Sequence, residues 1–188
     1  MQKGRDSHLR LIPLPSRERL GEGKRKAALP LAIAALVIAL DQLSKLWIRG
    51  NLMPGESLTM IGSLSLTHIR NTGSAFGLLA NQTFLLIIVT IASLLAILLF
   101  LRYLSPATTL SITSIGLILG GAIGNLIGRL RFGYVTDFID FRLWDNFHWP
   151  AFNFADAAIT IGIFTFIYSL YLLGLFRKVY EHNRKIKN

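Results

Sequence analysis

Four long apolar stretches, separated by polar segments, dominate the pattern of residues along the chain. They run over residues 27–48, 83–103, 108–127 and 154–176. Each is close to the ~20 residues that a helix needs to cross ~30 Å of hydrocarbon. Because the hydrocarbon holds no water for exposed backbone groups, each stretch is expected to be a helix. The pattern therefore predicts an all-α membrane protein with four transmembrane helices.

The polar segment between the first two stretches has a pattern of its own. Residues 57–61 and 64–68 alternate apolar with polar side chains, and Gly62-Ser63 lies between the two runs. Alternation on both sides of a short turn is typical of a β-hairpin. A small β-sheet is therefore expected at one end of the helices.

Composition agrees with a membrane protein. Hydrophobic residues make up 52% of the 188 residues and charged residues only 16%, where a soluble protein has about 25% charged. A chain of this length cannot bury so much apolar surface in one water-soluble core. Membrane lipid is therefore expected around the helices.

The net charge of +10 is concentrated at the two ends of the chain. Residues 1–26 carry eight Lys or Arg against three Asp or Glu, and residues 177–188 carry five against one. Basic ends that flank apolar spans indicate the cytoplasmic side, whereas a nucleic-acid binder carries a basic folded face. Both termini are therefore expected in the cytoplasm, and nucleic acid is not an expected partner.

Three segments follow from this pattern. Residues 1–26 are expected to be a disordered basic tail, or an upstream extension of the reading frame. Residues 27–176 form the four-helix domain, and residues 177–188 form a basic cytoplasmic tail. The loops at 49–82 and 128–153 then face outward, so the small sheet becomes an extracytoplasmic cradle.

Two carboxylates at the outer ends of the third and fourth stretches are candidates for catalysis. Asp137 follows the third stretch and Asp156 lies at the start of the fourth. Close carboxylates favour a singly protonated pair, in which one takes a proton from water and the other polarises a carbonyl. Asp140 is an alternative partner for Asp156, because spacing alone does not separate it from Asp137.

Each of these aspartates also has a structural interpretation. Asn153 and Asp156 have the spacing of a helix capping box. Asp137 has Arg129 and Arg131 within reach for a surface salt bridge.

Asp41 and Lys45 lie four residues apart near the outer end of the first stretch. This spacing allows a self-neutralising pair on one helix face. Charged groups in a span also suggest function, such as orienting the outer loop or contacting a substrate headgroup.

In the third stretch, Gly116, Gly120, Gly124 and Gly128 share one face and predict close helix packing.

Other chemistries find no support in the sequence. The chain has no cysteine, and its four histidines lack the spacing of zinc ligands. Neither a nucleophile elbow nor a phosphate-binding glycine loop is present. No metal and no cofactor are therefore expected. A proton-relay transporter and a scaffold that uses the glycine face are weaker alternatives, because the carboxylates cluster at one membrane face.

Five sequence motifs resemble those of bacterial lipoprotein signal peptidase, also called signal peptidase II. The similarity covers nearly all of residues 27–176 and excludes the N-terminal tail. The motifs are DQLSK at 41–45, NTGSAFG at 71–77, GGAIGN at 120–125 followed by Arg129, VTDF at 135–138, and FNFAD at 152–156.

The resemblance implies an aspartic endopeptidase in the bacterial cytoplasmic (inner) membrane, with its active site at the outer face. It implies that Asp137 and Asp156 form the catalytic dyad. The implied substrate is a prolipoprotein whose cysteine carries diacylglycerol, cut just before that cysteine. Six further residues are implied to bind substrate, brace the site or position it, namely Asn71, Asn125, Arg129, Asn153, Asp41 and Lys45.

One position departs from the family's pattern. The family has aspartate directly before the arginine of the third motif, and this chain has Gly128. Our hypothesis is that tighter packing on the glycine face compensates for the missing carboxylate.

Overall fold

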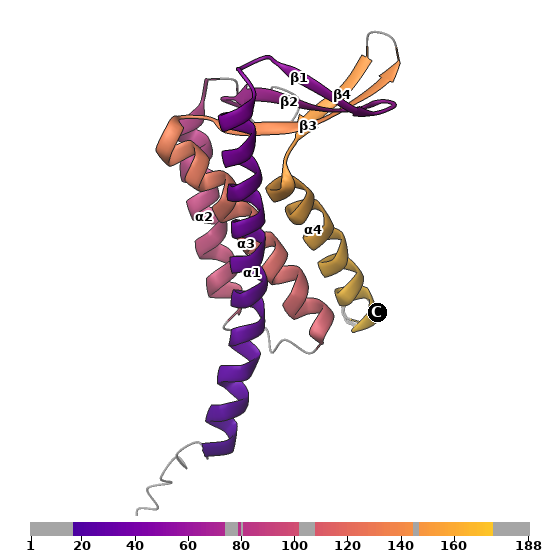
Figure 1. Cartoon of the computed structure of the whole chain (residues 1–188). Helices are drawn as coiled ribbons and strands as arrows, with labels where there is room; N and C mark the ends of the chain where they lie inside the picture. Colours follow the sequence, from indigo (N-terminus) through magenta and orange to yellow (C-terminus); the bar gives the residue numbers. More distant parts are fainter. Residues whose placement is uncertain (1–16, 74–78, 80, 102–107, 145–146, 175–188) are drawn as a thin grey trace, which may run out of the picture.

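The computed structural model describes residues 17–73, 79, 81–101, 108–144 and 147–174. Four helices form a bundle with a small sheet at one end (Figure 1). In chain order the elements are α1 (Arg17–Asn51), β1 (Ser57–Ile61), β2 (Leu64–Asn71), α2 (Thr83–Leu101), α3 (Thr109–Phe132), β3 (Val135–Trp144), β4 (Phe147–Phe152) and α4 (Phe154–Leu172). The prediction of a helical membrane protein with a small sheet is confirmed.

Three of the helices contain segments long and apolar enough to cross a membrane, namely Ala28–Asn51, Thr109–Phe132 and Phe154–Leu172. The apolar segment of α2, Thr83–Leu99, is shorter. Many large apolar side chains point away from the bundle, such as Leu36, Leu43 and Phe164, which are 60%, 64% and 70% exposed. Such a surface requires an apolar surrounding, which lipid supplies.

Several helix ends differ from the predicted stretches. α1 begins at Arg17 rather than at residue 27, so residues 17–26 of the expected disordered tail are helical. Extending an existing helix adds one hydrogen bond for each residue that is ordered, so it costs far less than starting one. The remaining residues of that tail, 1–16, and the C-terminal tail at 177–188 lie outside the described residues. α3 continues past residue 127 and ends at Phe132. Gly133, which has a φ of 77°, caps its C-terminal end.

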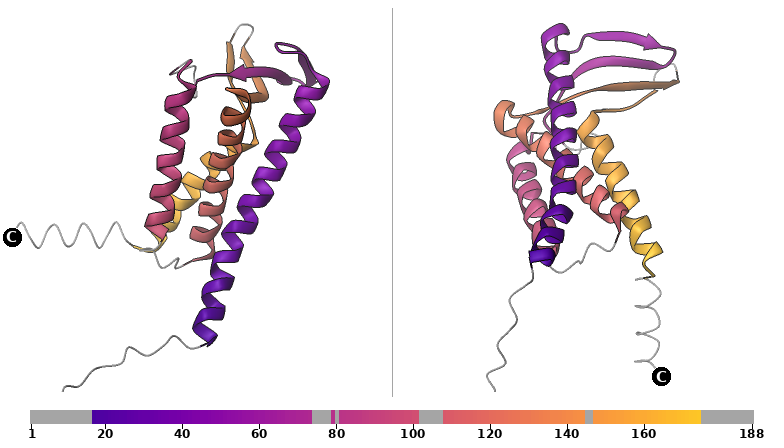
Figure 2. Two further views of the ribbon diagram at one scale, coloured as in Figure 1. Left: turned by 90° about the vertical axis from the view of Figure 1, so that its left-hand side faces the viewer. Right: turned by 60° about the horizontal axis from the view of Figure 1, so that its bottom comes forward.

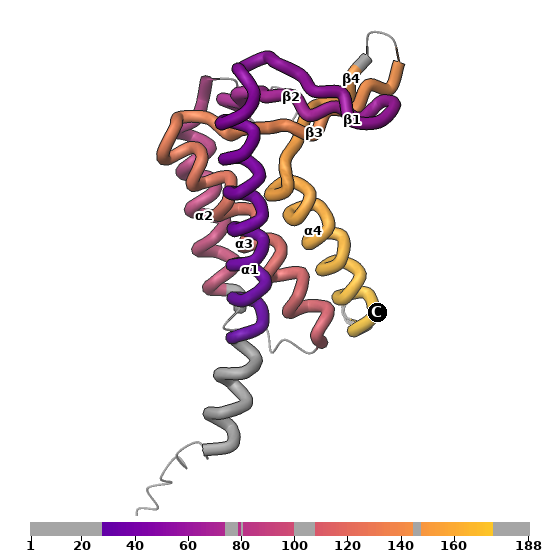
Figure 3. The backbone as a smooth tube through the Cα atoms, in the orientation of Figure 1, coloured from indigo at the N-terminus to yellow at the C-terminus, as the bar shows by residue number. Residues whose placement is uncertain are grey.

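The sheet contains four antiparallel strands in the order β1-β2-β3-β4. β1 and β2 are the predicted hairpin, and Gly62 takes a φ of 56° in its turn. β3 and β4 come from the segment between α3 and α4, for which no strand was predicted. Figure 2 and Figure 3 show that the whole sheet lies at the end of the bundle where α1 ends and α4 begins.

The helix α3 lies between α1 and α4, and its glycines allow the close approach. A Cβ atom on Gly120 would lie 2.7 Å from the Val37 Cβ of α1. A Cβ atom on Gly121 would overlap the carbonyl oxygen of Ala155 in α4. The predicted packing face therefore exists for Gly116, Gly120 and Gly124, which all face α1.

Gly128 departs from that pattern. A Cβ atom there would lie 3.1 Å from the carbonyl oxygen of Tyr134, just before β3, and no neighbouring helix of the described structure is within 4 Å. The hypothesis that Gly128 extends the helix-packing face is therefore wrong. The chain that leads into β3 lies beside Gly128 in place of a helix.

A buried apolar cluster joins the sheet to α1. It consists of Ile48, Leu52 and Phe138, of which Ile48 is 1% exposed and Phe138 3% exposed. Phe138 lies on β3 directly after Asp137. The cluster therefore holds the part of β3 that carries this carboxylate against the end of α1.

Candidate active site

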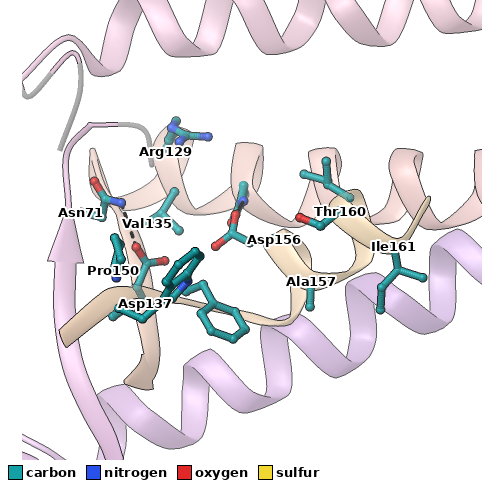
Figure 4. Close-up of a pocket in the computed structure, with 14 residues that line it drawn as sticks. Asn71, Arg129, Val135, Asp137, Pro150, Asp156, Ala157, Thr160 and Ile161 are labelled. Atoms are coloured by element: carbon teal, nitrogen blue, oxygen red, sulfur yellow. Dashed lines mark hydrogen bonds between the residues drawn. The ribbon is translucent and has the colours of Figure 1, made fainter. Parts of the chain in front are cut away.

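Asp137 and Asp156 line one cavity of about 540 Å³ between the sheet and the helices. Asp137 comes from β3 and Asp156 from the first turn of α4, and in Figure 4 both carboxylates point into the same space. The two residues are nineteen positions apart in the chain. The β3–β4 hairpin returns the chain to the start of α4 and so brings them together.

Two side-chain amides hold the Asp137 carboxylate. Asn71 Nδ2 donates to Asp137 Oδ2 at 2.8 Å, and Asn153 Nδ2 donates to Asp137 Oδ1 at 2.6 Å. Asp137 is 3% exposed. The expected surface salt bridge with Arg129 or Arg131 is absent among the described residues.

Asp156 serves as a helix cap and as part of the cavity wall. Its backbone N–H donates to Asn153 Oδ1 at 3.0 Å, and its Oδ2 accepts from the Asn153 N–H at 3.1 Å. This is the predicted capping box. The other carboxylate oxygen, Oδ1, accepts from Asn125 Nδ2 at 2.7 Å. The capping box fixes the Asp156 side chain within the cavity wall, so capping the helix and acting in catalysis are compatible roles for this residue.

Asn153 connects the two aspartates. Its Nδ2 donates to Asp137 and also to Asn125 Oδ1, at 3.3 Å. Its Oδ1 accepts from the Asp156 backbone. The side chain is fully buried. Asn153 therefore contacts both the Asp137 carboxylate and the first turn of α4 that carries Asp156.

Asp41 and Lys45 form a buried ion pair behind the cavity. The Lys45 Nζ lies 2.8 Å from Asp41 Oδ2, and the Lys45 and Asp41 side chains are 1% and 0% exposed. Lys45 Nζ also donates to Asn125 Oδ1 at 2.8 Å, and Asp41 Oδ1 accepts from the Ala155 N–H at 3.1 Å. The predicted pairing is confirmed, and both side chains are buried within the protein. The ion pair braces Asn125 and the start of α4. Asp41 and Lys45 themselves are not among the described residues that line the cavity.

Asp140, the alternative partner for Asp156, lies elsewhere. Its Oδ2 accepts from Thr67 Oγ1 at 2.9 Å, and its Oδ1 lies 2.8 Å from His148 Nδ1. Asp140 does not contribute to the described cavity lining. The structure therefore gives no support to a dyad of Asp140 and Asp156.

The surroundings of Asp137 favour its protonated form. Burial first, and then the charge of Asp156, raise the pKa of Asp137 to about 6, although the amides of Asn71 and Asn153 and the charge of Lys45 act in the opposite direction. The groups that donate directly to the two carboxylates are all amides in the described structure, so no cation neutralises either one directly. Such a pair can hold one proton between two carboxylates.

The rest of the cavity is mostly apolar. Arg129 lines it and donates to the Gly73 carbonyl at 3.3 Å. The apolar part of the wall comprises Val135, Trp149–Phe152, Ala157, Ile159 and Ile161. Sequence reasoning missed the contribution of β4, although the partly alternating pattern over 135–144 could have predicted its partner β3. Residues 74–77 of the second motif lie outside the described residues.

No group of three or more His, Cys, Asp or Glu side chains in the described part of the chain could hold a metal ion.

Comparison with known proteins identifies relatives of the chain. Residues 33–172 match the sequence model of the family described as Signal peptidase (SPase) II. A lipoprotein signal peptidase of Moorella thermoacetica is 51% identical over 143 residues, which cover 76% of this chain and 92% of that protein. The lipoprotein signal peptidase of Desulforapulum autotrophicum is 44% identical over 155 residues, which cover 78% of this chain and 91% of that protein.

Two solved structures are also similar to the chain. A bacterial membrane enzyme structure obtained by the in meso method at 2.3 Å resolution aligns with a TM-score of 0.68 and 34% identity, covering 76% of this chain and 87% of that chain. A second such structure, at 1.9 Å resolution, aligns with a TM-score of 0.65 and 34% identity, covering 75% of this chain and 91% of that chain.

Proposed function

Because the chain belongs to the signal peptidase II family and is a membrane protease that removes signal peptides from prolipoproteins, we propose that Asp137 and Asp156 form its catalytic dyad. The observation that carries the assignment is the shared cavity. Both carboxylates line it, and Asn153 donates to one while accepting from the backbone of the other.

The geometry supports an aspartic mechanism. The ionised carboxylate takes a proton from a water molecule as the water oxygen attacks the scissile carbonyl carbon. The protonated carboxyl donates its proton to the carbonyl oxygen, which gives a neutral tetrahedral intermediate. When the carbon–nitrogen bond breaks, the carboxyl that received the water proton passes a proton to the leaving nitrogen. The other carboxylate takes back a proton from one hydroxyl of the intermediate, which leaves the new carboxyl group of the product. The dyad titrates as a unit, so the two roles belong to the pair.

The remaining site residues act through position. Asn71, Asn125 and Asn153 hold the carboxylates, while Asp41 and Lys45 hold Asn125 and the start of α4. Buried, fully connected polar networks of this kind restrict their members to one arrangement. Arg129 is the cationic group on the described cavity wall and is suited to orient a polar part of the substrate.

The substrate we propose is a prolipoprotein whose cysteine already carries diacylglycerol, cut just before that cysteine. The apolar wall supports this, since Ile159 and Ile161 continue it from the carboxylates along α4, which is itself a candidate span. Acyl chains and an apolar signal peptide both favour such a surface.

The location we propose is the bacterial cytoplasmic membrane, with both termini in the cytoplasm and the site at the outer face. The basic residues at both ends of the chain support this orientation. Residues 27–176 then form the peptidase domain.

A gel-shift assay tests the dyad. Purified protein in detergent is mixed with a diacylglyceryl-modified prolipoprotein, and release of the signal peptide is followed. Asp137→Asn and Asp156→Asn should each lower the rate by about 10²- to 10⁴-fold, the range for loss of a general acid or base. Asp140→Asn is the matched control, because Asp140 is a buried carboxylate on the same strand and is expected to leave the rate within a few-fold of the parent.

Two results would contradict the assignment. One is cleavage by folded Asp137→Asn or Asp156→Asn protein at the parent rate. The other is a loss of cleavage in Asp140→Asn that equals the loss in Asp137→Asn. Thermal unfolding of each variant in the same detergent separates a loss of catalysis from a loss of fold.

A further inference from the structure

A second cavity of about 550 Å³ lies at the end of α1. Its wall comprises residues 49–54, Glu56, His68, Arg70 and Tyr134; we call it the rim cavity. The candidate span Ala28–Asn51 ends within this wall. Trp47, one turn before that end, is 48% exposed, and exposed tryptophan is typical of the membrane–water boundary. The rim cavity therefore lies at the depth of lipid headgroups.

Three arginines gather beside the rim cavity. The Arg49 and Arg131 guanidinium carbons lie 4.6 Å and 5.3 Å from the centre of the same Phe132 ring. The Arg70 guanidinium carbon lies 5.2 Å from the centre of the Tyr134 ring. Those two rings are 5.9 Å apart, and Arg49 and Arg70 both line the rim cavity.

None of these arginines has a carboxylate partner within 4.0 Å in the described structure. Arg49 Nη1 donates to an uncharged group, Thr136 Oγ1, at 3.1 Å. Glu56, the acidic residue of the rim cavity, accepts from the Met53 N–H at 2.7 Å. Arginines without a direct carboxylate partner favour an anion, and the guanidinium group is suited to phosphate oxygens.

His68 provides an independent indication of a ligand. The side chain is 3% exposed. Its Nδ1 lies 2.9 Å from the Leu52 carbonyl oxygen. A carbonyl only accepts, so Nδ1 carries the hydrogen and Nε2 of the neutral ring is an acceptor. This Nε2 is buried without a partner among the described residues, and buried polar atoms in native proteins are normally hydrogen-bonded.

We propose that the rim cavity binds the headgroup of a membrane phospholipid. Its phosphodiester lies between Arg49 and Arg70, and a hydroxyl or ammonium hydrogen on its alcohol side is donated to His68 Nε2. This site is separate from the catalytic cavity and does not depend on the dyad. It selects headgroups that carry a donor, such as glycerol or ethanolamine, over choline, which has the same phosphodiester but no N–H or O–H group.

Native mass spectrometry of the purified full chain tests the proposal. The protein is titrated with phosphatidylglycerol, phosphatidylethanolamine or phosphatidylcholine of identical acyl chains, and separately with inorganic phosphate. The first two lipids should bind about tenfold more tightly than phosphatidylcholine, the effect of one buried hydrogen bond. Inorganic phosphate at the same concentration should not displace them, because it lacks the acyl chains that lie in the bilayer.

Variants separate the two contacts. His68→Asn keeps a short amide N–H for the Leu52 carbonyl but removes the acceptor, so it should abolish the preference over phosphatidylcholine. His68→Gln places an amide oxygen near the former Nε2 position and should restore part of that preference. Arg70→Gln should weaken all three lipids by about tenfold, and Arg70→Lys should weaken them less because it keeps the charge.

Several outcomes would overturn the proposal. Equal affinity of the parent for all three lipids would mean that Nε2 contacts only water. Full displacement by inorganic phosphate would identify a soluble anion as the ligand. Unchanged lipid binding in Arg70→Gln would exclude the guanidinium contact. These readouts do not involve cleavage, so they are independent of the result for Asp137 and Asp156.

Discussion

The buried pair of Asp41 and Lys45 allows a sharp test of the bracing network. We consider Lys45→Met, which keeps the length of the side chain and removes its charge. Lys45 Nζ has two contacts to lose, the ion pair with Asp41 and the hydrogen bond to Asn125, both at 2.8 Å. The variant leaves the Asp41 carboxylate with no exposed surface and no cation.

The magnitude follows from what remains around Asp41. Breaking a buried ion pair by removing one partner typically costs about 3–5 kcal/mol, because the other charge stays buried. Gln42 Nε2 and the Ala155 N–H still donate to the Asp41 carboxylate, at 2.9 Å and 3.1 Å. These two donors compensate part of the burial, so we expect a loss near the lower end, about 3 kcal/mol of unfolding free energy.

A double-mutant cycle isolates the charge. The double variant Asp41→Asn/Lys45→Met has no buried charge at these positions, and the amide oxygen that it introduces in place of the carboxylate can still accept from the Ala155 N–H. It should therefore be more stable than Lys45→Met alone. Cleavage should remain impaired in both variants, by about 10²-fold, because Asn125 has lost the contact that orients it toward Asp156.

Unfolding free energies measured in mixed micelles, together with the gel-shift cleavage rate, provide the assay. Two results would refute the reasoning. If the double variant is less stable than Lys45→Met by the full cost of Asp41→Asn alone, the two residues are not coupled. If Lys45→Met cleaves at the parent rate, Lys45 does not position the site.

Three further predictions follow from the site and its supports. The pKa of Asp137 is raised from 3.8 to about 6, so between these pH values the folded protein holds a proton on Asp137 that the unfolded chain has lost. The free energy of unfolding should therefore fall by up to about 3 kcal/mol as pH rises from 4 to 6. In thermal unfolding, the stability of Asp137→Asn should depend less on pH across this range. Gly121→Ala should destabilise the protein and slow cleavage, because its Cβ atom would overlap the Ala155 carbonyl oxygen at the start of α4, whereas Gly50→Ala, with nothing within 4 Å of its Cβ atom, should be neutral in the same assays. Gly128→Asp, which restores the family residue, should cost about 1–3 kcal/mol in thermal unfolding because its Cβ atom would lie 3.1 Å from a backbone carbonyl oxygen; unchanged stability and cleavage would show that the position no longer matters.

Much of the architecture could be predicted from local sequence patterns. The starts of α2 at Thr83 and α4 at Phe154 coincide with the predicted apolar stretches, since the requirement for ~20 apolar residues acts within one segment of the chain. The alternating pattern likewise predicted the β1–β2 hairpin. The capping box of Asn153 and Asp156 spans only four residues and could also be predicted.

Properties that depend on distant segments could not be obtained in this way. Spacing alone left Asp137 and Asp140 equivalent. In the structure Asp137 lines the cavity with Asp156, whereas Asp140 contacts Thr67 and His148. The four-residue spacing of Asp41 and Lys45 predicted that they pair. It did not predict that both side chains would be buried and would connect to Asn125, because that connection exists only when α3 packs against α1.

The same physical distinction applies to the rim cavity. Arg49, His68, Arg70 and Tyr134 come from α1, β2 and the segment before β3. Nothing in the sequence near any one of them indicates the others. Hydrophobic periodicity and chain-local hydrogen bonds are properties of neighbouring residues, so they can be read along the sequence. Which charged and polar groups share a cavity depends on how the elements pack, and that arrangement appears only in the folded chain.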